Sequence, residues 1–326
     1  MIKRLLCVRT AGTDPYENLA VEELLLDTVG EGECILYLWQ NDHTVVIGRN
    51  QNVWKECRVS VLEQEGGHLA RRLSGGGAVY HDLGNLNFTF LMREEDYDLD
   101  RQLQVIETAC RSVGLSVERS GRNDVLAEGR KFSGNAFYHS KGRAYHHGTL
   151  LVDTDGARLS RYLSPSKAKL QAKGVDSVRS RVVNLAQLCP GLTCGDMARA
   201  MEAAFGQVYG LTPEPVQLNR LDGAKVAQLR ERNASADWLF GPRLPLSMEC
   251  EKRFDWGGVP LQLQVESGVV TAARVYTDAM EWQLAQELEQ VLTGSNFSVR
   301  AMCERIQRAG LDHGADLCAL LTEQEL

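Results

Sequence analysis

The segment of this sequence best suited to contact an anion is a run of three glycines next to two arginines. It reads Arg71-Arg72-Leu73-Ser74-Gly75-Gly76-Gly77-Ala78-Val79-Tyr80-His81-Asp82-Leu83-Gly84-Asn85. Consecutive glycines cost backbone entropy, but without side chains their N–H groups can face a phosphate directly. The two arginines could add forked, charge-assisted contacts. A flexible hairpin loop is the alternative, because a glycine run alone is weak evidence.

This segment matches neither of the two common nucleotide-binding loops. No G-x-x-x-x-G-K-[ST] motif occurs, and Gly75-x-Gly77 is followed by Tyr80 where G-x-G-x-x-G requires glycine. Ser164 and Lys167 have the spacing of a serine hydrolase pair, but the companion motifs are missing. A nucleotide bound here would therefore need a lysine from elsewhere in the chain.

Lys131 is the candidate for that lysine. It lies in Arg130–Ala136 (RKFSGNA), a predicted strand, beside serine and glycine. Lysines are mostly exposed, so one that points inward needs an anionic partner. A phosphate, a substrate carboxylate or Asp124 would serve, and a solvated lysine at a sheet edge is the alternative.

Three histidines are further candidates. His81 stands next to Asp82, and a lone histidine on a strand is usually structural, although this pair could orient a polar group at the mouth of a site. No metal-ligand spacing connects it to another histidine. His146 and His147 are adjacent in a predicted strand, so their side chains point to opposite faces and only one can line a site.

The segment 161–181 carries six lysines and arginines and a single acidic residue. Such cations repel each other and become ordered when an anion enters, as in a lid over a phosphate. We expect Lys173, Arg179 and Arg181 to belong to a mobile lid, with a solvated loop as the alternative.

The elements that must position these groups are short strands mixed with helices. The patterns predict strands at 5–10, 34–39, 44–47, 69–73, 78–81, 87–92, 122–126, 130–138 and 143–151, and helices starting at Pro15 and spanning 55–64, 103–113, 194–209 and 234–240. Glu128-Gly129 and Lys141-Gly142 predict tight hairpin turns. Strands and helices do not alternate strictly, which favours an α+β fold with a mostly antiparallel sheet.

A second, smaller α+β domain is expected after Gly241-Pro242 and Pro245. The tail predicts strands at 261–265, 269–272 and 274–277, with a Ser-Gly turn at 267–268, and helices at 282–292 and 299–310. The predicted domains are 1–244 and 245–326.

Composition limits the class of protein. The chain has 326 residues, of which 44% are hydrophobic, enough for more than one small core. A net charge of −7 and a pI near 5.6 argue against a general nucleic-acid binder. Nine cysteines without a C-x-x-C pair are typical of reduced cytosolic thiols. No signal peptide or long apolar run is present, so we expect a cytoplasmic monomer that does not span a membrane.

In their order along the chain, these segments resemble the two-domain bacterial lipoate–protein ligase A family of the biotin/lipoyl protein ligase superfamily. The resemblance rests on residues 71–85, 121–124, 130–136, 146–151 and 173–184, and extends to 14–23, 45–49 and 254–259. It implies an α+β catalytic domain over 1–244, with mostly antiparallel sheets flanked by helices. It also implies a small α+β accessory domain over 245–326 that swings when an adenylate forms.

The resemblance implies a two-step reaction. Lipoate attacks the α-phosphate of ATP, giving lipoyl-AMP and pyrophosphate, with Mg²⁺ as the implied metal. A lysine of a lipoyl domain of a 2-oxoacid dehydrogenase E2 subunit, or of the glycine-cleavage H protein, then attacks the acyl carbonyl and AMP leaves. Adenylation is needed because an oxide cannot leave a carboxylate.

The resemblance also assigns roles to individual residues. Lys131 is the implied catalytic residue and contacts both lipoate and nucleotide. The other implied contacts are Arg72, Gly77, Ala78, Val79 and Tyr80 for ATP; Arg71, Ser74, His81 and His147 for lipoate; and Gly75, Gly76, Asn85, Asn123 and Asp124 for the adenylate and magnesium, with Asp124 as the metal ligand.

Two alternatives stay open. Octanoyl- and lipoyl-transferases share the implied fold but use a cysteine nucleophile and no ATP. No cysteine lies between Cys110 and Cys189, the stretch that holds Lys131 and both adjacent histidines. A carrier-binding module without catalysis is the other alternative, and the presence of Lys131, Arg72 and the three glycines argues against it. No residue decides between lipoate and octanoate.

Overall fold

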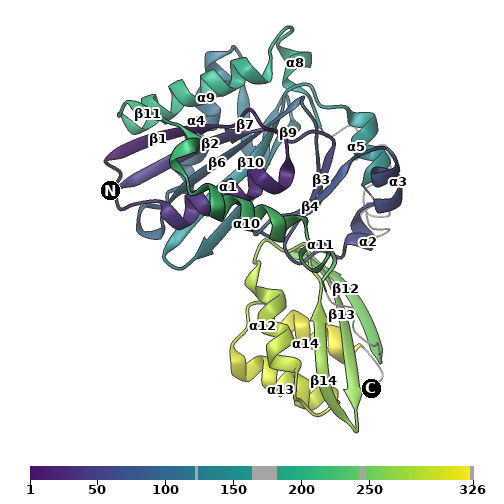
Figure 1. The fold of residues 1–326 in the computed structure, drawn as a ribbon. Coiled ribbons are helices and arrows are strands. Elements are labelled where there is room, and N and C mark those ends of the chain that lie inside the picture. Colours follow the sequence, from purple (N-terminus) through teal and green to yellow (C-terminus); the bar gives the residue numbers. More distant parts are fainter. Residues whose placement is uncertain (122–123, 164–181, 242–246, 324–326) are drawn as a thin grey trace.

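The computed structural model describes residues 1–121, 124–163, 182–241 and 247–323. Figure 1 shows a larger part built on a long sheet and a smaller C-terminal part joined to it near α11 (Ala236–Phe240). The large sheet has the order β11-β1-β2-β6-β10-β9-β8-β7. Its strands are β1 (Arg4–Arg9), β2 (Glu33–Trp39), β6 (Asn85–Arg93), β7 (Val117–Ser120), β8 (Asp124–Ala127), β9 (Arg130–Ser140), β10 (Arg143–Leu151) and β11 (Pro213–Val216).

This sheet is mostly antiparallel, which confirms the predicted fold class. Only β1 pairs in parallel, with β2 and β11, and the other neighbours run antiparallel. Alternate residues of each strand face opposite layers. On β2, Leu36 and Leu38 join the apolar cluster that contains α4 (Leu99–Ser112) and α9 (Cys194–Tyr209). Tyr37 and Trp39 face α1 (Pro15–Thr28).

Helix α1 begins as the sequence predicts. The Asp14 side chain accepts hydrogen bonds from the backbone N–H groups of Tyr16 and Glu17, and Pro15 occupies the first turn. Helix α10 (Gly223–Ala234) packs along α1 through Leu229, against Ala20 and Leu24. Short helices α8 (Leu185–Leu188), η1 (Glu94–Asp96) and η2 (Leu218–Arg220) complete this part.

A second sheet of three strands stands beside the first and carries the glycine segment. Its order is β4-β3-β5, where β3 (Thr44–Ile47) pairs in parallel with β4 (His68–Arg71) and antiparallel with β5 (Val79–His81). The glycine loop, residues 74–77, connects β4 to β5. Around this sheet lie α2 (Val53–Glu56), α3 (Val59–Gln64) and α5 (Gly156–Tyr162).

The single helix predicted over 55–64 is wrong, since α2 and α3 are separate. Cys57 between them is extended, with φ −133° and ψ 138°, and forms a β-bridge with Leu163. A residue in a β-bridge must be extended, so the helix cannot continue through Cys57.

The C-terminal part is the predicted α+β unit with a different strand pattern. It contains β12 (Met248–Phe254), β13 (Gly257–Glu266), β14 (Val269–Val275), α12 (Gln283–Leu292), α13 (Val299–Ala309) and α14 (Gly314–Thr322), which share one apolar cluster. The two strands predicted over 269–277 are one, β14, while β12 was not predicted. The predicted boundary after residue 244 lies within 242–246, outside the described residues.

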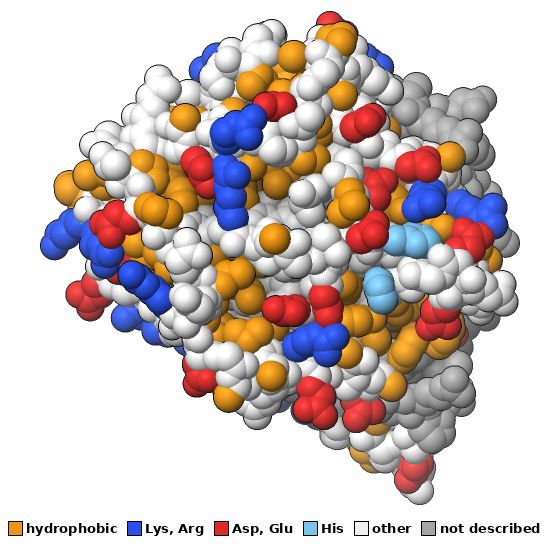
Figure 2. All heavy atoms as spheres, turned by 45° about the horizontal axis from the view of Figure 1, so that its top comes forward, with side chains coloured by type: hydrophobic (Ala, Val, Ile, Leu, Met, Phe, Trp, Pro, Cys, Tyr) orange, Lys and Arg blue, Asp and Glu red, His pale blue; other side chains and the backbone are white. Residues whose placement is uncertain are grey.

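The surface carries both signs of charge. Acidic and basic side chains lie interspersed among apolar ones on the face shown in Figure 2. Within the described ranges, no helix combines the length and the apolar character needed to cross a bilayer.

Candidate functional site

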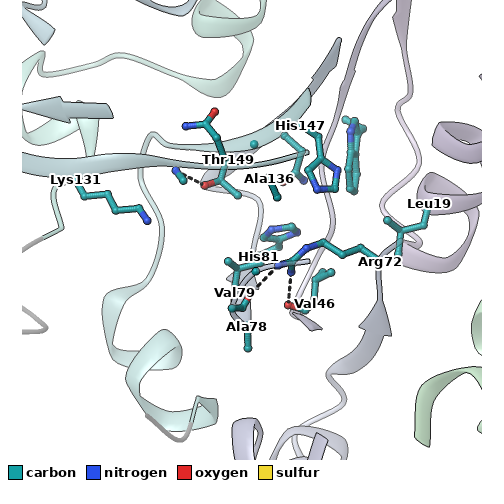
Figure 3. Close-up of a pocket in the computed structure, with 17 residues that line it drawn as sticks. Leu19, Val46, Arg72, Ala78, Val79, His81, Lys131, Ala136, His147 and Thr149 are labelled. Carbon is teal, nitrogen blue, oxygen red and sulfur yellow. Dashed lines mark hydrogen bonds between the residues drawn. The ribbon is translucent and has the colours of Figure 1, made fainter. Parts of the chain in front are cut away.

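A cavity of about 170 Å³ lies between the two sheets of the larger part. Its walls come from α1, the strands β2, β3, β5, β6, β9 and β10, and the glycine loop. Figure 3 shows Lys131 and Leu19 on opposite sides of this cavity, with His81 between them. Eight of the residues predicted from sequence line it: Arg72, Gly76, Gly77, Ala78, Val79, His81, Lys131 and His147.

Lys131 has an anionic partner, as expected for a lysine that points inward. Its Nζ lies 2.6 Å from Asp124 Oδ1 on the neighbouring strand β8. A Cβ on Gly134 would lie 3.0 Å from the same Nζ, so glycine leaves room for the lysine to lie along the strand. Both charged groups are about one-third exposed. The pair can therefore exchange partners with a substrate anion that enters the cavity.

Arg72 organises the glycine loop from within. Its guanidinium donates to the carbonyls of Val46, Gly75 and Gly77 and to Ser74 Oγ. Burial lowers its pKa to about 10, which still leaves it charged at neutral pH. These bonds tie the carbonyl groups of the loop to one cation, so most of the donors of Arg72 are already used.

Arg71 lies outside the cavity. Its side chain donates to backbone carbonyls on two sides, those of Gly48, Arg49 and Gln51 and those of Trp238 and Leu239. It thereby joins the segment after β3 to helix α11. Arg71 does not line the cavity, so the structure gives no support to its predicted contact with lipoate.

The glycine loop contacts the C-terminal part directly. The Gly76 N–H donates to the Ala279 carbonyl at 2.9 Å. A Cβ on Gly75 would lie 2.4 Å from that carbonyl oxygen, so only glycine permits this approach. The Gly76 N–H, which could bind a phosphate, is therefore occupied by the Ala279 carbonyl in this structure.

His147 lines the cavity and is held by two polar contacts. Its Nδ1 lies 2.9 Å from Glu22 Oε1 on α1, and its Nε2 lies 2.8 Å from Ser74 Oγ. Glu22 also accepts a hydrogen bond from Thr89 Oγ1 at 2.7 Å. Ser74 is fully buried behind the cavity wall. This network connects α1, β6 and β10 to the start of the glycine loop.

His146 points to the other face of β10, as predicted for adjacent strand residues. Its ring nitrogens lie 3.0 Å from Gln102 Oε1 and 2.7 Å from Asn135 Oδ1. Burial, and to a lesser degree the nearby His147, lowers the pKa of His146 to about 3. Its role is structural.

His81 lines the cavity as a neutral ring. Burial is the main cause that lowers its pKa to about 3, with smaller contributions from Arg72 and His147. Its Nδ1 lies 3.2 Å from Asn41 Nδ2. Its neighbour Tyr80 points away from the cavity, toward the ring of Tyr162.

The remaining predicted residues are peripheral or not described. The Asn85 side chain is buried and donates at 2.9 Å to Asn87 Oδ1, and Asn87 lines the cavity. Asn123, Lys173, Arg179 and Arg181 lie outside the described residues. In the described ranges no group of three or more histidine, cysteine or acidic side chains could hold a metal, so Asp124 is a single carboxylate beside the cavity.

Part of the cavity wall was not predicted from the sequence. The missed residues are Leu19, Trp39, Val46, Asn87, Gly134, Asn135, Ala136, Gly148 and Thr149. Buried apolar residues on a strand or helix look like ordinary core, and only the register between sheets shows which of them face a hollow.

No cysteine lines the cavity, although all nine cysteines lie in the described ranges and are unpaired thiols. Cys110 is buried in α4, where burial raises the pKa of its thiol to about 12. A thiol in that state is a poor nucleophile.

Comparison with known proteins identifies this architecture. The sequence profile of the lipoyl protein ligase A/B catalytic domain matches residues 14–206, and that of the bacterial lipoate protein ligase C-terminus matches 245–317. The fold is similar to P. falciparum LipL1 in complex with lipoate (TM-score 0.87, 24% identity, 98% of this chain and 100% of that chain).

Two further solved structures each match about three quarters of this chain. One is a bi-partite lipoate protein ligase of Thermoplasma acidophilum, described with its E2 lipoyl domain (TM-score 0.65, 27% identity, 76% of this chain and 100% of that one). The other is a lipoate-protein ligase A bound with ATP (TM-score 0.63, 26% identity, 74% and 99%). With its two matching domains, the chain belongs to the lipoyl protein ligase A/B family, in the form that carries the bacterial lipoate protein ligase C-terminus.

Proposed function

We propose that this protein is an ATP-dependent lipoate–protein ligase that forms lipoyl-AMP and passes the lipoyl group to a lysine of a carrier domain. The observation that carries the proposal is the cavity itself. It joins apolar walls to Lys131 and to a glycine loop, and no cysteine faces it. Relatives solved with ATP and with lipoic acid support the same two substrates.

The apolar walls suit the hydrocarbon tail of lipoate. Leu19, Trp39, Val46, Val79 and Ala136 line the cavity, and Figure 3 shows Leu19 on the side opposite Lys131. Burying the tail contributes roughly 0.8 kcal/mol per CH₂. The carboxylate then lies toward Lys131, where a cation is available.

Lys131 is the residue that we assign to the chemistry. The lipoate carboxylate attacks the α-phosphorus, and negative charge moves onto the phosphate oxygens. The ammonium of Lys131 can shift from Asp124 to both substrate groups, a preorganised contact worth roughly 10²–10³ in rate. Gly76 and Gly77 allow close approach of the backbone to the phosphate.

Magnesium fits this site only as an ion carried by the nucleotide. Mg²⁺ usually binds one or two carboxylates together with substrate phosphates, and Asp124 offers one carboxylate beside the cavity. When bound, the ion would neutralise phosphate charge. Residues of this chain would still hold the tail and orient the carboxylate.

In the second step, the amine of the carrier lysine attacks the acyl carbonyl and AMP leaves. We propose lipoyl domains of E2 subunits as carriers, supported by the archaeal relative described with its E2 lipoyl domain. The glycine-cleavage H protein is a second proposed carrier. The nine unpaired thiols support a reducing, cytoplasmic location, and a monomer remains a prediction.

The test is lipoate-dependent ATP–pyrophosphate exchange, which a ligase shows and a cysteine-dependent transferase or a binding module does not. Lys131→Ala should lower this exchange by 10²-fold or more, with an unchanged circular dichroism spectrum. The neighbouring Arg130→Ala is the matched control, because Arg130 pairs only loosely with Glu128 at 3.6 Å. Near-normal exchange in Lys131→Ala would contradict the assignment.

A further inference from the structure

Arg49 is a cation held in place without an ion pair to any described carboxylate. It follows β3, and its guanidinium carbon lies 4.5 Å from the centre of the Trp238 ring. Within the described part of the chain, its side chain donates no hydrogen bond and forms no ion pair, and the nearby Glu23 carboxylate is paired with Arg232. Burial lowers its pKa, which reflects the cost of holding this charge away from water. A bound anion from outside the chain would compensate for this loss of hydration.

The other arginines around it already have polar or charged partners. Arg71 and Arg72 donate to backbone carbonyls, as described above. Arg232 lies 4.6 Å from the centre of the same Trp238 ring, but it forms an ion pair with Glu23. Arg274 lies 3.5 Å from Glu289. Among the described arginines of this region, Arg49 is the one that forms neither a side-chain hydrogen bond nor an ion pair.

The backbone at Arg49 is in direct contact with the glycine loop. Its N–H donates to the Ser74 carbonyl at 2.9 Å. A Cβ on Gly48 would lie 2.2 Å from the Gly76 carbonyl oxygen, so the two segments touch without intervening side chains. Arg49 lines a cleft of about 360 Å³ between the two parts of the molecule, together with Arg71 and Arg274. Asp237 and Glu289 line the same cleft, and Glu289 pairs with Arg274, so Arg49 is the cation of this cleft that is left for an anion. The cleft lies against the loop that borders the first cavity.

We propose that Arg49 binds the β- and γ-phosphates of ATP and holds the pyrophosphate as it leaves. This assignment rests on the proposed function. When the lipoate carboxylate oxygen bonds to the α-phosphorus, the bond from that phosphorus to the bridging oxygen breaks. The electron pair departs with pyrophosphate, whose growing charge needs a cation. Lys131 is engaged at the α-phosphate, and Arg72 is tied to the loop carbonyls.

Stacking on Trp238 makes Arg49 suited to this role. An aromatic face stabilises a guanidinium and fixes its plane, leaving its N–H edge available for phosphate oxygens. Arginine binds phosphate through two parallel hydrogen bonds, which lysine cannot reproduce. Replacement by lysine should therefore restore only part of the function.

The experiment separates the two half-reactions. Arg49→Gln should lower ATP–pyrophosphate exchange by on the order of 10²-fold and raise the KM for inorganic pyrophosphate at least tenfold. Arg49→Lys should fall between this variant and the wild type. Transfer from isolated lipoyl-AMP to a lipoyl domain should stay within about twofold of wild type, because no pyrophosphate takes part. Arg232→Gln, which removes the paired arginine from the same ring, is the matched control and should retain exchange.

Each other outcome has a defined meaning. If the wild type shows no exchange, the proposed function fails before the role of Arg49 is tested. If the wild type exchanges and both folded Arg49 variants exchange equally well, the inference is overturned. Normal exchange with lost transfer would place Arg49 at the carrier domain and would also overturn it. Thermal unfolding of each variant shows whether the fold is retained, and Arg49→Lys keeps the test valid if Arg49→Gln does not fold.

Discussion

His146 and His147 are consecutive residues with opposite surroundings. His147 faces the cavity and bonds to Glu22 and Ser74. His146 lies in the core between Gln102 and Asn135 and beside the rings of Phe88, Phe90 and Phe137. A neutral imidazole suits that core, because a charge there would lose its hydration. The stability of the fold should therefore depend on pH through His146.

The direction follows from the two pKa values of this histidine. The folded pKa is about 3 and the unfolded value is about 6.5, so below pH 6.5 the unfolded chain binds a proton that the folded chain does not. The free energy of unfolding should fall by about 1.4 kcal/mol per such histidine between pH 7.5 and 5.5. His81 contributes in the same direction.

His146→Gln should remove the His146 contribution, about 1.4 kcal/mol of the pH-dependent loss. Urea unfolding of wild type and variant at both pH values measures it. Equal pH dependence in the two proteins would show that His146 can be protonated in the fold.

The arginines show which part of the site could be predicted from residue types. The sequence marked Arg71 and Arg72 as anion contacts because they adjoin the glycines. In the structure both are bonded to backbone carbonyls, and Arg49 has the unused donors. An arginine can bind a substrate anion only if the fold does not place backbone carbonyls against its guanidinium. The types of the neighbouring residues in the sequence do not show where those carbonyls lie.

At the scale of elements, the β9–β10 hairpin carries both Lys131 and His147. Its turn, Lys141-Gly142, has φ values of 51° and 70°, the left-handed pair of a two-residue hairpin. The sequence predicted this turn, because glycine adopts such a conformation without a steric penalty. The register of the hairpin, and with it the face on which each residue lies, depends on the turn.

Gly142→Ala should destabilise the protein by about 1–2 kcal/mol, because a Cβ is unfavourable at positive φ. Space is not the cause, since no atom lies within 4 Å of that Cβ position. Gly156→Ala is the control: it lies in open space at the start of α5 without a positive φ, and should be neutral or slightly stabilising. Urea unfolding of the two variants compares them, and equal stabilities would refute the argument.

Elements with strong local signals could be predicted, and those set by tertiary contacts could not. The predicted bounds of β3, β10 and α9 are those observed, because each is a periodic run between turn residues or caps. Strand β12 was missed because Glu249, Glu251 and Arg253 are exposed on an edge strand. Helix α10 has only two buried residues, so its apolar pattern is weak.

At the scale of the whole molecule, the C-terminal part closes over the glycine loop. Asn50 donates to the Trp282 carbonyl at 2.6 Å and accepts from the Thr277 N–H at 2.9 Å. The Trp282 ring lies 4.9 Å from that of Tyr138, between ring centres. The Gly76 N–H cannot bond to the Ala279 carbonyl and to a phosphate at the same time. Nucleotide binding to the loop should therefore compete with this docked arrangement.

Hydrogen–deuterium exchange can test this competition on the full chain. With saturating ATP and lipoate, the Thr277 amide should exchange faster, because its bond to Asn50 is lost when the segment 277–282 leaves the loop. Gly75→Ala should show the faster exchange without substrates, since its Cβ would lie 2.4 Å from the Ala279 carbonyl oxygen. If lipoyl-AMP forms while exchange at Thr277 stays unchanged, the loop binds phosphate without releasing the C-terminal part. The nucleotide would then depend on Gly77 and the residues after it, and the contact at Gly76 would be permanent.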